Sequence, residues 1–199
     1  MFEPKSMAGL SLEEKFQILL DERDIRGIYD RYSRACARAD LDMFKSCFHD
    51  DAIDHHPPTY DGKISEFYKI FDTMAEKTAA TIQYYLTNIL IELDGDVAYT
   101  ECYGLSAKGL NERAYNGDQV MRVSGLRYLH RMERRNGEWR IAEVWFVPEW
   151  AFYKQVPEQI ASIGIYASAK DRAMNPIPAR RNKNDISYVL DTLKGVSGN

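Results

Sequence analysis

The chain has 199 residues, a net charge of −4, and a composition of 45% apolar and 28% charged residues. These values are ordinary for a soluble globular protein and exclude a fibrous or low-complexity chain. No cluster of positive charge is large enough to predict nucleic-acid binding. No run approaches the ~18 apolar residues of a membrane span, and the first residues lack an apolar core of signal-peptide length. We therefore expect a cytoplasmic protein that binds neither nucleic acid nor membrane.

The first third of the chain is predicted to be helical, after a loose arm over residues 1–10. Ser11 and Glu14 form the pattern of a capping box, which starts a helix by satisfying free backbone amides. Apolar residues then recur every three or four positions up to Cys36, which predicts one long amphipathic helix or two joined pieces. Asp40 is a suitable cap for a short second helix. The stretch ISEFYKIFDTMAEKT, residues 64–78, predicts a third amphipathic helix.

The middle of the chain changes to a pattern of strands. HDDAIDHHPPTYDGK, residues 49–63, predicts a short strand, a break at two prolines and a turn ending at Gly62. Strand-like segments follow at about 79–93, 96–108, 118–135 and 138–149. The order predicts an α+β fold, with the helices on one face of a curved antiparallel sheet around a deep pocket. We place the domain at 11–150 and a C-terminal extension at 151–199, packed on the domain or on a neighbouring subunit.

Several phrases in this order resemble the SnoaL-like branch of the nuclear-transport-factor-2-like superfamily. They are IRGIYDRYSRACARADLDMFKSCFHDDA, LTNILIELDGDVAYTE, RYLHRMERRNGEWRIA followed by EW, and RRNKNDISY, spread over roughly residues 20–190. The resemblance implies a cone-shaped NTF2-like barrel. It also implies acid–base catalysis without cofactor or metal on a small apolar substrate, as in scytalone dehydratase, bile-acid 7α-dehydratase and hexachlorocyclohexane dehydrochlorinase. Relatives are commonly dimers or trimers, so a homo-oligomer is expected.

The chain departs from the dehydratase pattern at the residues that carry the chemistry. Dehydratases of this family use an Asp–His pair. Here the Asp position holds Ala37 and the His position holds Tyr84. An Arg that is common in the last strand is replaced by Val144, and Asp40 fits a helix cap better than a catalytic acid. A different set of groups must therefore carry any reaction.

Tyrosine and histidine are the replacements that we expect. Because Tyr84 occupies the position where relatives hold their base, the resemblance implies that it faces the cavity; by strand parity Asn88 shares that face and Tyr85 points away. A phenol is a good proton donor but a poor base at neutral pH, whereas histidine suits the base. The candidate catalytic residues are Tyr32, which matches a tyrosine of bile-acid dehydratase, and His56, Tyr84 and His130. Pocket lining or core packing is the structural alternative for each of them.

Further polar and aromatic side chains are candidates for binding the substrate: His55, Tyr60, Asn88, Glu101, Tyr103, Arg127, Tyr128 and Trp145. Glu101 is also a possible base if buried, and an exposed sheet face is its alternative. Arg122 is a candidate anion or oxygen binder, like Arg127. Phe146 and Trp150 extend Trp145 into an aromatic wall or a core. No metal site is predicted, because adjacent histidines on a strand point to opposite faces.

These features predict a cofactor-independent lyase acting on a hydroxylated aromatic substrate. The family variant that fits is the diarylpropane γ-formaldehyde lyases, which remove water and formaldehyde from a lignin-derived diaryl diol to leave a stilbene. The alternatives are a dehydratase, an isomerase or cyclase of a steroid- or polyketide-like substrate, and a binding protein without catalysis.

Overall fold

A computed structural model of the chain describes residues 6–77, 79–156 and 181–188. The elements in chain order are α1 (Leu12–Arg38), α2 (Leu41–Lys45), β1 (Phe48–His56), β2 (Tyr60–Lys63), α3 (Ile64–Lys77), β3 (Ala79–Asp94), β4 (Val97–Arg113), β5 (Gln119–Arg135), β6 (Glu138–Val156) and the short 3₁₀ helix η1 (Ile186–Tyr188). No helix within the described residues is both long enough and apolar enough to cross a membrane.

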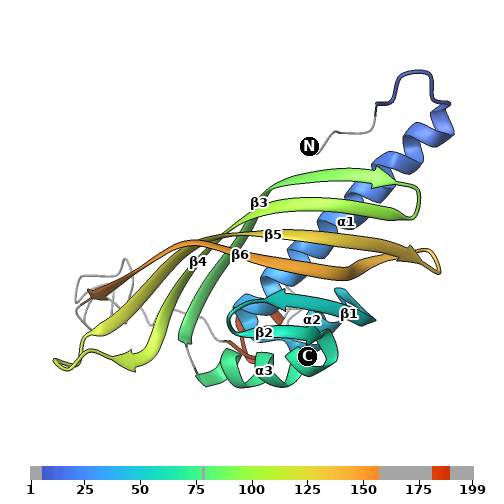
Figure 1. The fold of residues 1–199 in the computed structure, drawn as a ribbon. Coiled ribbons are helices and arrows are strands. Elements are labelled where there is room, and N and C mark those ends of the chain that lie inside the picture. The colour runs from blue at the N-terminus through green and yellow to red at the C-terminus, as the bar shows by residue number, and fades with distance from the viewer. Residues whose placement is uncertain (1–5, 78, 157–180, 189–199) are drawn as a thin grey trace, which may run out of the picture.

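The six strands form one strongly curved sheet (Figure 1) in the order β2-β1-β6-β5-β4-β3. β3 to β6 form the expected antiparallel meander. β1 instead runs parallel to β6, with Phe48 opposite Ile141, so the sheet is mixed and not purely antiparallel. The sheet stays open, with β2 and β3 at its edges. The architecture is the α+β cone that the sequence predicts, with one parallel pair and without closure into a barrel.

The helices cover the concave side of this sheet. α1 is one continuous helix of 27 residues, which decides between the two alternatives left by the sequence. The predicted capping box is present: Ser11 Oγ accepts from Glu14 N, and Ser11 N donates to the Glu14 carboxylate. Asp40 caps α2 by accepting from Met43 N. α3 contacts β1, β2 and β3, so it bridges the two edges of the open sheet. Figure 1 shows α1 crossing behind the strands and α3 lying below them.

Two strands are longer than the sequence patterns indicate. β4 continues to Arg113 rather than ending near residue 108, because β4 and β5 stay paired as far as Arg113 opposite Gln119. β6 continues to Val156, six residues beyond the expected domain end at 150. The stretch GLNERAYNG, residues 109–117, has the sequence pattern of a longer connection, but it is strand as far as Arg113.

The parity prediction for β3 is wrong beyond Thr87. A bulge shifts the register between Thr87 and Leu90, and Asn88 adopts a left-handed backbone with φ of 52°. Because a bulge inserts an extra residue, it reverses which side chains face inward. Asn88 is consequently exposed, while Ile89 and Ile91 take the inward positions.

The described part of the C-terminal extension packs on its own chain. Arg181 donates to the backbone oxygens of Cys36 and Ala37 at the end of α1. Lys183 Nζ and Tyr188 Oη each lie 2.7 Å from one carboxylate oxygen of Asp40. The stretch DISYVLDTL, residues 185–193, has the sequence pattern of a weak helix. η1 coincides with its start, and residues 189–193 lie outside the described residues.

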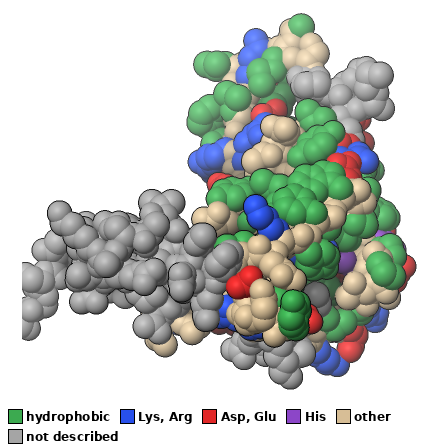
Figure 2. Space-filling model, turned by 90° about the vertical axis from the view of Figure 1, so that its left-hand side faces the viewer, with side chains coloured by type: hydrophobic (Ala, Val, Ile, Leu, Met, Phe, Trp, Pro, Cys, Tyr) green, Lys and Arg blue, Asp and Glu red, His purple; other side chains and the backbone are tan. Residues whose placement is uncertain are grey.

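Several large apolar side chains remain on the surface, including Leu90, Tyr99, Tyr103 and Leu105, each more than 40% exposed. Figure 2 shows hydrophobic side chains gathered over the middle of one face of the molecule. Exposed apolar patches often mark contacts with other proteins. The expected dimer or trimer stays a prediction.

Candidate active site

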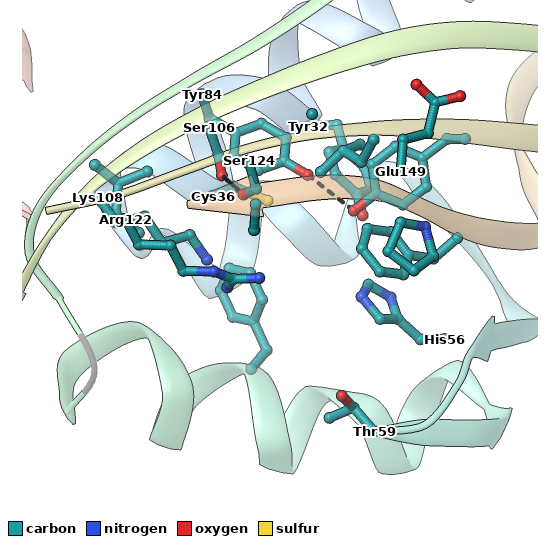
Figure 3. Close-up of a pocket in the computed structure, with 18 of the residues that line it drawn as sticks. Tyr32, Cys36, His56, Thr59, Tyr84, Ser106, Lys108, Arg122, Ser124 and Glu149 are labelled. Carbon is teal, nitrogen blue, oxygen red and sulfur yellow. Dashed lines mark hydrogen bonds between the residues drawn. The ribbon is translucent and has the colours of Figure 1, made fainter. Parts of the chain in front are cut away.

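A cavity of about 380 Å³ lies between the concave face of the sheet, the C-terminal half of α1 and α3. Figure 3 shows its polar groups, with Lys108 and Arg122 at one end, His56 and Thr59 at the other, and tyrosine and serine side chains between them. The lining residues used below come from α1 (Tyr32, Cys36), β1 (His56), α3 (Phe67, Phe71), β3 (Ile82, Tyr84), β4 (Ser106, Lys108), β5 (Arg122, Ser124, Leu126, Tyr128), β6 (Phe146, Glu149, Trp150) and the C-terminal segment (Arg181).

Three tyrosines from three elements meet in the middle of this cavity. The hydroxyls of Tyr84 and Tyr128 lie 2.8 Å apart, within hydrogen-bond distance. The rings of Tyr32 and Tyr128 meet edge to face, with centroids 5.6 Å apart. Burial raises the pKa of all three phenols well above its ordinary value. At neutral pH they are therefore uncharged hydroxyls, suited to donate a proton or a hydrogen bond to a substrate oxygen.

His56 approaches the same cavity from the end of β1. Its ring stacks on Phe146, with centroids 3.8 Å apart, and also lies over Phe67. Its Nδ1 is 3.7 Å from Oδ1 of Asp54, a carboxylate that is 2% exposed. That oxygen is buried and has no hydrogen-bond partner among the described residues. Asp54 and His56 therefore form a carboxylate–imidazole pair on β1.

Sequence reasoning did not assign a role to Asp54, although a signal was present. In a strand, residues two apart share a face, so the stretch AIDHH places Ala52, Asp54 and His56 on one side. The structure confirms this alternation: Ala52 and Asp54 are buried, and His56 lines the cavity. The chain thus lacks the family's Asp–His pair at Ala37 and Tyr84 but has another Asp–His pair on β1.

His130 does not line the cavity. It is 3% exposed and lies behind the tyrosines, with its Nδ1 3.0 Å from the hydroxyl of Tyr29. Tyr29 in turn donates to Thr100 Oγ1 at 2.6 Å. Burial lowers the pKa of His130 to about 3, so the imidazole stays neutral inside the core. This position gives His130 no contact with a molecule in the cavity.

Most of the candidate binding residues lie outside the cavity as well. Of the twelve candidates, Tyr32, His56, Tyr84 and Tyr128 line it. Glu101 and Arg127 form an ion pair of 3.4 Å beside Tyr103, which is 43% exposed, on the convex face of the sheet. Glu101 and Tyr103 flank the buried Cys102 along β4, and Arg127 precedes the buried Tyr128 on β5. Because neighbouring side chains of a strand point to opposite faces, these three residues face outward.

The remaining candidates also belong to the outer surface or the rim. His55 stacks on Trp145 and binds Asp61 and Glu143. Tyr60 packs against Phe67, and its hydroxyl donates to the backbone oxygen of Lys63. Asn88 lies in the exposed bulge of β3. Phe146 and Trp150 line the cavity, whereas Trp145 points away from it. The aromatic wall therefore contains two of the three aromatic residues that we expected there.

Two kinds of group in the cavity were missed by sequence reasoning. Ser106 and Ser124 are register partners whose hydroxyls lie 2.9 Å apart. Lys108 faces Arg122 at the next inward pair. Arg122 was a candidate anion binder, but nothing local in the sequence marks Lys108 as its partner. Among the described residues, no three His, Cys, Asp or Glu side chains come together as a metal site.

Comparison with known proteins identifies the family. Residues 17–144 match the SnoaL-like domain family, so the chain belongs to that family. No curated protein matches the sequence at a significant level. The fold is similar to that of a candidate scytalone dehydratase from Novosphingobium aromaticivorans, with a TM-score of 0.63, 12% identity, and coverage of 71% of this chain and 93% of the other.

Two further solved structures share the fold at similarly low identity. The type 2 hexachlorocyclohexane dehydrochlorinase LinA gives a TM-score of 0.60 at 16% identity, covering 71% of this chain and 93% of its own. A candidate aromatic ring hydroxylase from Novosphingobium aromaticivorans gives 0.58 at 17% identity, covering 69% and 94%. At these identities the likeness establishes the fold, and the function must be argued from the site.

Proposed function

We propose that the protein is a cofactor-independent lyase that acts by general acid–base catalysis on a hydroxylated aromatic substrate. The observation that carries the proposal is the meeting of the Asp54–His56 pair with three neutral phenols in one aromatic cavity. An acid and a base facing the same enclosed space are what elimination from a neutral substrate requires. A dehydratase and a dehydrochlorinase among the solved structures of this fold, both named for eliminations, are in keeping with this.

The finer proposal is the loss of water and formaldehyde from a diaryl diol to give a stilbene. A phenol, from Tyr84 or Tyr32, gives its proton to the benzylic hydroxyl, which leaves as water. His56 takes the proton of the terminal hydroxymethyl group. The C–C bond to that group breaks, its electron pair forms the new double bond, and formaldehyde leaves. The proton gained by His56 balances the one given by the tyrosine, so solvent can restore both groups and no oxidant is needed.

The cavity walls favour a substrate with aromatic rings. Phe67 and Phe146 flank His56, and Phe71 and Leu126 line the space farther in. Burial in such surroundings excludes water and strengthens the hydrogen bonds that a phenol makes to a developing charge. Tyr128, bound to Tyr84, keeps that hydroxyl in place.

The experiment is a turnover assay without added metal or cofactor on aromatic diols, phenolic dimers and hydroxysteroids, with products identified by mass. Loss of water plus formaldehyde from a diaryl diol is the expected result. Loss of water alone would make the protein a dehydratase that uses the same groups. An unchanged mass with altered chromatography would indicate an isomerase or cyclase. Saturable binding with no chemical change would contradict the enzyme proposal.

A further inference from the structure

Two positive side chains face each other inside the cavity. Lys108 on β4 is the register partner of Arg122 on β5, and both belong to the inward-facing row that also holds Ser106 and Ser124. Arg181 lines the same region. Like charges directly opposite on a sheet repel each other and destabilise it. The pairing of Lys108 with Arg122 therefore costs the fold some stability, even in a chain whose net charge is −4.

Among the described lining residues, no carboxylate is left to pair with Lys108 or Arg122. The one carboxylate among the described lining residues is Glu149, which is already bound to Arg127 at 2.6 Å. The Nε of Arg122 is buried and has no hydrogen-bond partner in the described part of the chain. Burial lowers the pKa of Lys108, and the charge of Arg122 lowers it further. A buried donor without a partner loses its hydration without compensation, so the site gains by taking an anion.

We propose that this cationic end, Lys108 with Arg122, binds the carboxylate of an aromatic acid. Guanidinium and ammonium donors match a planar carboxylate and form strong charge-assisted hydrogen bonds with it. Ile82 and Leu126 supply apolar contacts for a ring next to it. The inference deepens the proposed function, on which it rests for calling the bound molecule a substrate: the hydroxylated aromatic compound carries a carboxylate.

The register places this carboxylate at a useful distance from the phenols. Ser106 is the partner of Tyr84 on β3, and Lys108 is the next inward residue along β4. Two residues of strand span about 7 Å. A ring bound between the two positions would therefore direct its carboxylate to Lys108 and Arg122 and its benzylic hydroxyl toward Tyr84. His56 lies beyond, at the other end of the cavity (Figure 3).

Calorimetric titration with two probes of the same shape tests this inference. Biphenyl-4-carboxylate carries the charge, and biphenyl-4-carboxamide is its neutral counterpart. At low salt we expect the carboxylate to bind at least tenfold more tightly than the amide. That preference should fall at least tenfold in Arg122→Gln and in Lys108→Gln. It should persist in Arg131→Gln, a matched control on the same strand whose side chain lies outside the cavity and binds Glu143 and Glu133.

Thermal unfolding separates a binding role from a structural one. Removing a repelling cation should leave the Tm of ligand-free Arg122→Gln equal to or above that of the wild type, and the carboxylate should no longer raise it. Equal affinities of the wild type for both probes, no binding of either, or a preference that survives in both variants would overturn the inference.

Failure here and failure of the proposed function give different results, because binding of these probes needs no turnover. A lyase that turns over neutral diols and shows no carboxylate preference would overturn the anion site alone. A clear carboxylate preference in a protein that transforms no substrate would support the anion site and contradict the lyase.

Discussion

Tyr84 and Tyr85 are neighbours in sequence, yet they occupy different environments. Tyr84 lines the cavity and binds Tyr128, while Tyr85 is 47% exposed and its hydroxyl donates to Gln83. Strand alternation separates them, and this much could be predicted from sequence. The partner of Tyr84 could not, because Tyr128 belongs to a strand that is not its neighbour in the sheet.

The pair also provides a matched test of the acid. Tyr84→Phe removes one proton donor and should lower kcat about 10²- to 10³-fold, as the loss of one oxyanion-stabilising donor does. Tyr85→Phe, the same change on the opposite face, should leave kcat unchanged. Steady-state kinetics on both variants checks this, and equal rates for the two would rule out a chemical role for Tyr84.

His130 should affect stability rather than catalysis. Burial lowers its pKa to about 3, so between that pH and the ordinary value of about 6.5 only the unfolded chain takes up the proton. The free energy of unfolding should therefore fall as the pH drops, by about 1.4 kcal/mol for each pH unit below about 6.5 from this group.

Denaturant unfolding between pH 7 and pH 4 measures this slope. His130→Gln should lose this part of the acid dependence. His55→Gln should retain it: burial alone would lower the pKa of His55, but the hydrogen bonds of its ring to Glu143 and Asp61 outweigh that and raise it. The contribution of His55 to the free energy of unfolding is therefore present at low pH and is lost as the pH rises through its raised pKa. An unchanged acid slope in His130→Gln would contradict the assignment.

At the scale of elements, local signals were reliable and pairings were not. Ser11 with Glu14 and Asp40 mark helix starts by chemistry that involves residues three apart, and both predictions are confirmed. The bulge at Asn88 and the parallel pairing of β1 with β6 depend on how distant strands meet. No local pattern carries that information, which is why Asn88 was assigned to the wrong face.

Asp40 has a second role besides capping α2: it binds Lys183 and Tyr188 and so joins the C-terminal segment to the helices. Burial by itself would raise its pKa, but hydrogen bonds from Lys183, Tyr188 and Met43 outweigh burial and lower it. The stabilisation is therefore present above the ordinary pKa of about 4 and is lost as the pH falls through the lower value in the folded protein. Because the segment also carries Arg181, its docking helps to shape the cationic end of the cavity.

Asp40→Asn isolates this role, since asparagine still caps a helix but cannot pair with Lys183. We expect a loss of about 1–3 kcal/mol in the free energy of unfolding and faster hydrogen exchange in residues 181–188. Asp42→Asn, on the exposed side of the same helix, is the control. If exchange in the segment is the same in both variants, Asp40 does not hold it.

At the scale of the whole molecule, the helices pack over the concave side of the open sheet. Together they enclose a deep cavity whose two ends differ in chemistry. The Asp54–His56 pair lies at one end and the Lys108–Arg122 pair at the other, with the phenols between them. The fold and the presence of a pocket could be predicted from helix periodicity, strand order and family resemblance. The two ends could not, because the lining residues come from five strands and two helices that meet only after folding.

The measurement that tests the account most directly is the pH dependence of kcat/KM for wild type and His56→Gln, without added metal or cofactor. For the wild type we predict a fall on the acid side as the base takes up a proton. With a neutral diol as substrate, which makes no use of the Lys108 charge, we predict no fall on the alkaline side below about pH 10, because burial raises the pKa of the phenols above that ordinary value. His56→Gln should lose the acid limb and about 10²- to 10⁴-fold in rate. An acid limb that survives in this variant at wild-type rate would contradict the account.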